Sequence, residues 1–151
     1  MTEKILLVDD DTVMLKLMGM LIHEKTPYEL VATNNPLEGL ELAAQNNIDL
    51  VIANLKMPHV DGMKILEAIK RVREDVPVII MSAYSSLETA MEAMRKGAFD
   101  YITQPVKREQ MLVAIEKALQ WKRLRRENKM LSERIEKAER GCVYGSSVSS
   151  A

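Results

Sequence analysis

Residues 49–62, which read DLVIANLKMPHVDG, decide the fold of this 151-residue chain. Four consecutive apolar residues, 50–53, suit a strand that is buried on both faces, as strands of parallel sheets are. The run ends at Asn54, and a proline and an Asp-Gly turn follow within eight residues. This pattern predicts a buried strand with a polar side chain at its carboxyl end.

A similar apolar run over residues 5–8 ends at Asp9 and Asp10. In an open parallel sheet, the carboxyl ends of neighbouring strands meet in the crevice where such folds bind ligands. Carboxylate oxygens gathered there are the ligands that a hard divalent cation prefers. A third carboxylate at position 54 could also act as a nucleophile toward phosphorus, whereas the amide of Asn54 cannot.

Apolar runs alternate with helical patterns along the chain. Five repeats of strand and helix predict an α/β fold with a doubly wound, five-stranded parallel sheet of the flavodoxin kind. On the first helix, Val13, Leu17, Met20 and Leu21 are expected to face the core. The expected strands cover 5–8, 28–33, 50–53, 76–81 and 99–102, and the expected helices cover 12–24, 36–45, 63–73, 86–96 and a segment from about 108.

The last helical pattern continues beyond the predicted domain as heptads. Leucines at position d and a single asparagine at position a favour a parallel two-stranded coiled coil, in which the asparagine fixes the register. Because three heptads are marginal alone, a solvated overhanging helix is the alternative. The predicted dimer seam consists of Trp121, Leu124, Asn128, Leu131, Ile135 and Ala138, with Cys142 after it.

Composition restricts the class of protein. Apolar residues make up 47% of the chain, charged residues 28%, and the net charge is -1, which are values of an ordinary globular protein rather than a basic nucleic-acid binder. The single cysteine excludes an internal disulfide framework, and the start of the chain is neither a signal peptide nor a membrane span. We therefore expect a cytoplasmic protein with a domain over 2–119, a helical linker over 120–140 and a flexible tail over 141–151.

Five motifs lie at the ends of the predicted strands: Asp9-Asp10, Asn54 to Pro58 with Asp61-Gly62, Met81-Ser82-Ala83, Gly97 to Tyr101 and Gln104-Pro105. Together, these motifs resemble the receiver domain of two-component response regulators, which has a CheY-like fold. The resemblance is strongest to receivers of nitrogen-regulation-type, sigma-54-dependent activators, in which a helical linker joins the receiver to an AAA+ ATPase. Residues 143–147 resemble the start of that ATPase, so the chain is expected to be an amino-terminal piece of a longer activator.

The resemblance implies a role for each motif residue. Asp10 would ligate Mg²⁺ directly, Asp9 would do so largely through water, and the backbone carbonyl of Lys56 would add a further ligand. Ser82 would hydrogen-bond a phosphoryl group, and Tyr101 would change rotamer with it. A sensor kinase or another regulatory protein is the implied partner.

Two residues depart from the family pattern. Asn54 stands where the family has its phosphoacceptor aspartate, and Gln104 stands where it has its phosphate-pairing lysine. The amide of Gln104 cannot neutralise a phosphoryl oxygen as an ammonium group does. The two amides are expected to hydrogen-bond each other if their side chains meet, and Mg²⁺ affinity should be weakened by Asn54.

Three functions remain open from the sequence. The first is a phosphorylation-independent pseudo-receiver that acts as a dimerisation module, without enzymatic activity, membrane contact or direct DNA binding. The second is a working phosphorelay receiver in which Asn54 was introduced to block phosphorylation. The third, from another class, is a metal-dependent phosphate-handling enzyme or a flavin carrier on the same fold, although the chain has neither a nucleophile at position 54 nor a glycine-rich phosphate loop.

Overall fold

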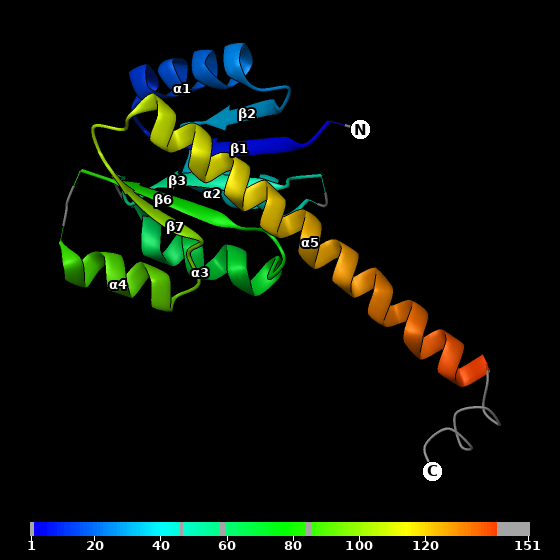
Figure 1. The fold of residues 1–151 in the computed structure, drawn as a ribbon. Helices are drawn as coiled ribbons and strands as arrows, with labels where there is room; N and C mark the ends of the chain where they lie inside the picture. Colours follow the sequence, from blue (N-terminus) through cyan, green and yellow to red (C-terminus); the bar gives the residue numbers. More distant parts are fainter. Residues whose placement is uncertain (1, 46, 58–59, 84–85, 142–151) are drawn as a thin grey trace.

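Five parallel strands form the centre of the molecule (Figure 1), in a computed structural model that describes residues 2–45, 47–57, 60–83 and 86–141. The sheet has the strand order β2-β1-β3-β6-β7, which is the doubly wound order predicted from the sequence. The predicted strand and helix boundaries hold to within two residues. The strands are β1 (Lys4–Val8), β2 (Glu29–Thr33), β3 (Leu50–Asn54), β6 (Val78–Ser82) and β7 (Asp100–Thr103).

Helices cover both faces of the sheet and create two apolar cores. Successive residues of a strand point to opposite faces, so Leu6 and Val51 belong to one core while Leu7 and Ile52 belong to the other. The first core is closed by α2 (Pro36–Ala44), α3 (Gly62–Val72) and α4 (Leu87–Arg95). The second is closed by α1 (Thr12–Lys25) and by the amino-terminal part of α5 (Arg108–Gly141).

The inward face predicted for α1 was largely wrong. Val13, Leu17 and Met20 are 62%, 57% and 58% exposed, and only Leu21 of the predicted set is buried. Met18 and Ile22 face the core in their place. The helix carries two apolar stripes at helical spacing, and hydropathy alone cannot tell which stripe meets the sheet.

The long helix α5 changes character along its length. Its inward residues recur at helical spacing as far as Lys122, which is 5% exposed, and every described side chain from Arg123 to Glu139 is exposed. Trp121, predicted to lie in the dimer seam, instead packs on Phe99 of its own domain with ring centroids 5.8 Å apart. The reason is that α5 still contacts its own domain, just before β7, at the turn that contains Trp121. The other seam residues through Ala138 are exposed, and Cys142 lies outside the described residues.

A two-stranded antiparallel hairpin follows β3 and was not expected from the sequence. Its strands are β4 (Lys56–Met57) and β5 (Val60–Asp61), and Asp61 caps α3 by accepting a hydrogen bond from the backbone N–H of Met63. The backbone N–H of Gly62 donates to the carbonyl of Leu55 across 2.7 Å. A Cβ atom at Gly62 would lie 2.6 Å from backbone atoms of Asn54 and Leu55, so only glycine lets the hairpin close this tightly.

Substitution of Gly62 should therefore destabilise the domain. In Gly62→Ala the new methyl group meets rigid backbone, and we expect a loss of about 1–3 kcal/mol in the free energy of unfolding. Gly19→Ala is the matched control, because its Cβ would meet only a side-chain atom of Leu30 at 3.5 Å. The control should gain about 0.5–1 kcal/mol from the lower entropy of the unfolded chain. Urea denaturation measures both, and equal stabilities for the two variants would contradict the crowding argument.

Candidate functional site

The candidate site lies where four strands end at the same edge of the sheet. Asp9 follows the last residue of β1, and Asn54 and Ser82 are the last residues of β3 and β6. Asn54 is in register with Met81, so Ser82 lies one residue beyond the level of Asn54. The backbone N–H of Gln104 donates to the carbonyl of Ser82 across 2.7 Å, which holds the end of β7 beside this group. The parallel register therefore brings these four predicted residues to one edge.

Asp9 is the deepest charged group of the site, with no exposed surface. Its Oδ1 accepts hydrogen bonds from the backbone N–H of Asp11 at 3.0 Å and from the Asn54 amide at 3.1 Å. Its Oδ2 is buried and has no hydrogen-bond partner among the described residues. Burial raises the pKa of the Asp9 carboxyl, against the opposing effect of the Asp11 and Asn54 hydrogen bonds. A buried, unpaired carboxylate oxygen is costly and would be compensated by a bound cation.

The amide of Asn54 is engaged on both sides. Its Nδ2 donates to Asp9, and its Oδ1 accepts from the backbone N–H of Lys56 at 3.3 Å. The expected hydrogen bond between Asn54 and Gln104 is absent from those that the described residues form. Both polar atoms of the Asn54 amide are instead engaged, by Asp9 just after β1 and by Lys56 on the hairpin.

The remaining predicted site residues differ in exposure. Ser82 is 1% exposed, whereas Tyr101 on β7 is half-buried and packs against the core that contains α3 and α4. Asp10 is exposed beside the buried Asp9. The cap of α1 is Asp11, whose carboxylate accepts from the backbone N–H groups of Val13 and Met14, so Asp9 and Asp10 are not consumed by capping.

The donors at this edge fit a hard divalent cation in kind. The unpaired Oδ2 of Asp9, the carboxylate of Asp10 and the carbonyl of Lys56 are oxygen ligands, and Mg²⁺ commonly completes its shell with water. Over residues 2–57, 60–83 and 86–139, with residue 46 left aside, no three histidine, cysteine or acidic side chains converge into a metal-binding group. Position 54 contributes an amide to this edge in place of a further carboxylate.

Sequence reasoning missed one buried ion pair far from this edge. Lys122 on α5 contacts Asp49, the residue before β3, with 2.7 Å between Nζ and Oδ1. The two residues are 73 positions apart in the sequence. The place of Lys122 one helical turn after the buried Leu119 and Ala118 was the available signal.

Comparison with known proteins gives a consistent family. The sequence model of the response regulator receiver domain matches residues 5–116. The chain is 37% identical over 116 residues to the transcriptional regulatory protein GlrR of Escherichia coli K12, covering 77% of this chain and 26% of GlrR. It is 32% identical over 132 residues to the regulatory protein AtoC of the same strain, covering 87% of this chain and 28% of AtoC. The chain thus spans about a quarter of the length of these relatives.

Solved structures agree with the fold. A receiver domain protein from Clostridium thermocellum superposes with a TM-score of 0.76 at 35% identity, covering 81% of this chain and 98% of that one. NtrX from Brucella abortus, in complex with ADP, superposes with a TM-score of 0.79 at 28% identity, covering 87% of this chain and 30% of NtrX. Among the described residues, none of the helices has a stretch long and apolar enough to cross a bilayer.

Removing the buried charge should stabilise the domain when no divalent cation is present. Burial raises the pKa of Asp9 above its unfolded value of about 3.9, so the wild-type domain loses stability as the pH rises through the interval between the two values. Asp9→Asn keeps an oxygen for Asp11 and Asn54 without the charge. We expect it to gain about 1 kcal/mol in the free energy of unfolding near neutral pH, and nothing below the unfolded pKa.

Urea denaturation in chelator-treated buffer at acidic and neutral pH measures this difference. Asp11→Asn is the matched control, since it makes the same chemical change at an exposed residue and asparagine caps a helix as well as aspartate does. A variant Asp9→Asn that is less stable than wild type at neutral pH would show that the buried carboxylate is compensated by another group.

Proposed function

The chain belongs to the response regulator receiver domain family, and we propose that it is a receiver that controls transcription without accepting a phosphoryl group at position 54. The relatives named above are regulators of transcription, which supports the same process for this chain. A regulator of bacterial transcription acts in the cytoplasm, and this is the location we propose. In this role the chain is a signalling and assembly module rather than an enzyme.

The observation that carries the proposal is the chemistry of Asn54. An amide oxygen is a poor nucleophile and cannot form the acyl phosphate that a carboxylate forms. In addition, the Asn54 amide already bonds the buried Asp9 and the hairpin, so its neighbours are arranged around a neutral group. Gln104, the other departure, has no ammonium group with which to pair a phosphoryl oxygen.

We propose a weak Mg²⁺ site on the same edge. Receiver domains generally bind Mg²⁺ at their phosphorylation site, and Asp9, Asp10 and the carbonyl of Lys56 would hold it here. The cation would supply positive charge against the unpaired Oδ2 of Asp9. Its affinity should be lower than that of a site with three carboxylates, because ligand charge tunes affinity for hard cations.

Introducing the family's residues at positions 54 and 104 should restore the response of a receiver. Beryllofluoride with Mg²⁺ mimics a phosphoryl group on an aspartate, so we expect it to leave the amide NMR spectrum of the wild-type chain unchanged. In the double variant Asn54→Asp with Gln104→Lys, the same addition should shift resonances around Asp9, Ser82 and Tyr101. Gln104→Lys alone is the control, since it adds the lysine without a nucleophile.

Each outcome of this experiment bears on the proposal. A stable adduct on the wild-type chain would contradict our interpretation of Asn54. If the spectrum of the double variant also stays unchanged, residues other than Asn54 and Gln104 must contribute to the loss of the response. Gln104 would then no longer support the proposal.

We further propose that residues 2–119 form the receiver, that residues 120–140 form a linker, and that an AAA+ ATPase follows. The linker would pair with a second copy in a parallel dimer. Support for pairing comes from apolar side chains that remain exposed at heptad spacing, namely Leu124 at 53%, Leu131 at 47% and Ile135 at 58%. Partners in control would be a sensor kinase or another regulatory protein.

Asn128 tests the seam. A polar residue at position a fixes register at a cost in stability, so Asn128→Leu should tighten association or raise the oligomer number in sedimentation equilibrium. Lys129→Leu is the control, because it adds the same side chain one residue outside the seam. If Asn128→Leu and Lys129→Leu associate equally, Asn128 does not lie in a dimer seam. That result would favour the alternative of a solvated overhanging helix.

A further inference from the structure

The helix α5 is held at the opposite edge of the sheet from the candidate site. In Figure 1 it crosses the sheet and continues beyond it. For four of the five sheet strands, the residue immediately before the strand contacts this helix or its neighbouring turn. These residues are Glu3 before β1, Tyr28 before β2, Asp49 before β3 and Phe99 before β7. We call them, together with the helical residues they contact, the linker socket.

The centre of the linker socket is the ion pair between Lys122, which is buried, and Asp49, which is partly buried. The Nζ of Lys122 lies 2.7 Å from Oδ1 of Asp49 and 3.4 Å from the carbonyl oxygen of Ile48. The other carboxylate oxygen of Asp49 accepts from the backbone N–H of Lys4 at 2.9 Å, and the backbone N–H of Asp49 donates to the Lys4 carbonyl at 2.8 Å. One carboxylate thus joins the starts of β1 and β3 to α5.

Polar contacts extend the socket toward β2. The guanidinium of Arg123 donates from Nε to both carboxylate oxygens of Glu3 at 3.0 Å, and from Nη2 to the Tyr28 hydroxyl at 3.2 Å. That hydroxyl donates in turn to Glu116 of the same helix at 2.6 Å. These groups are largely exposed, so their hydrogen bonds help to orient α5 but add little to the free energy of folding.

Aromatic contacts complete the linker socket on the side of β7. The Trp121 ring packs on Phe99, with Lys70 of α3 and Arg125 of α5 at 5.7 and 5.1 Å from its centroid. The ammonium group of Lys70 also donates to the carbonyls of Glu74 and Val76, in the loop before β6. Cations over an indole face attract it electrostatically, so this cluster ties the helix to the remaining strands.

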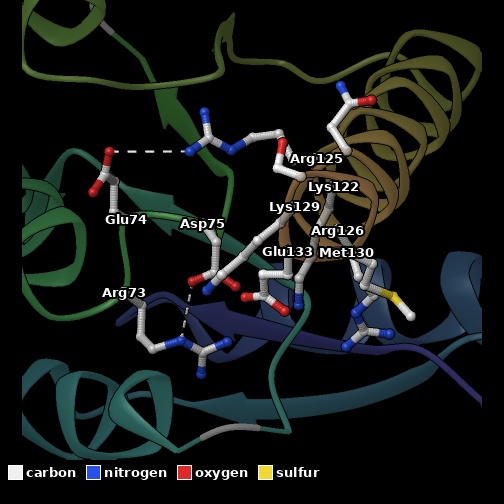
Figure 2. Close-up of a pocket in the computed structure, with 11 residues that line it drawn as sticks. Arg73, Glu74, Asp75, Lys122, Arg125, Arg126, Lys129, Met130 and Glu133 are labelled. Carbon is white, nitrogen blue, oxygen red and sulfur yellow. Dashed lines mark hydrogen bonds and ion pairs between the residues drawn. The ribbon is translucent and has the colours of Figure 1, made fainter. Parts of the chain in front are cut away.

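The socket ends abruptly at Arg125. A groove of about 950 Å³, lined by α5 from Lys122 onward, separates the helix from residues 73–75, as Figure 2 shows. Among the described residues, only the ion pair of Arg125 with Glu74 spans this groove. With 4.0 Å between its atoms and both side chains well exposed, that pair is weak. Lys122 is therefore the last residue of α5 whose side chain is enclosed by the domain.

We propose that Lys122 is a positioning residue that locks α5 to the sheet through Asp49 and thereby sets the direction in which the linker leaves the receiver. Removing the Lys122 ammonium leaves the partly buried carboxylate of Asp49 without its cation, so water must replace that contact. Salt screens exposed pairs more than enclosed ones, so the lock persists at ionic strengths that weaken Arg123 and Arg125. The inference depends neither on the chemistry at position 54 nor on pairing of the linker.

A distance measurement on the whole chain tests the lock. Spin labels at Glu41→Cys on α2 and Lys137→Cys on α5, in a Cys142→Ser background diluted with unlabelled chain, report the direction of the linker within one molecule. We expect a narrow distance distribution for this protein and a clearly broader one after Lys122→Met. Lys129→Met is the matched control, because Lys129 lies two turns further on the same face and makes no ion pair among the described residues; it should leave the distribution narrow.

Folding of each variant is checked by its amide NMR spectrum. If Lys122→Met does not fold, the double variant Lys122→Met with Asp49→Asn removes both charges together and should give the broad distribution. A narrow distribution in whichever of these variants folds would overturn the proposal. A distribution that is already broad in the unsubstituted protein would overturn it as well.

Discussion

The structure depends on enclosing β1, β3 and β6 between two layers of helices. Residues 5–8, 50–53 and 78–81 have no exposed surface, and burial of such apolar side chains is the main driving force of folding. A strand closed on both faces leaves no place for a polar side chain within its length. Polar chemistry is therefore confined to the two edges of the sheet, where strands begin and end.

The two edges treat a charge in different ways. At the carboxyl edge, one carboxylate oxygen of Asp9 has no hydrogen-bond partner in the part of the chain that the structure describes, and burial raises the pKa of this carboxyl group. At the amino edge, both oxygens of Asp49 are paired, one with Lys122 and one with the backbone of Lys4. An unpaired buried group is costly and responsive to ligands, whereas a paired one is rigid. The two edges of the sheet thus differ in whether the carboxylate they hold is fully paired.

Most of the fold and part of the site could be predicted from the sequence, for identifiable reasons. Buried strands such as β3 read as continuous apolar runs, and their polar ends, Asp9 and Asn54, follow from the run lengths alone. The face of α1 could not be predicted, because Val13 and Met18 belong to two different stripes that are both apolar. The partners of Asn54 depend on side-chain positions fixed by the hairpin after β3, which has only two-residue strands. The pairing of Lys122 with Asp49 joins distant segments, and no local pattern encodes it.

The helix α5 continues without a break beyond the domain, so a small change in its tilt moves its far end. From Arg125 to Gly141 the helix advances ~24 Å at 1.5 Å per residue. Each degree of tilt about the socket would displace the far end by ~0.4 Å at that length. The position of the helix end at Gly141 is thus set by the contacts that hold α5 against the sheet, those around Lys122 included.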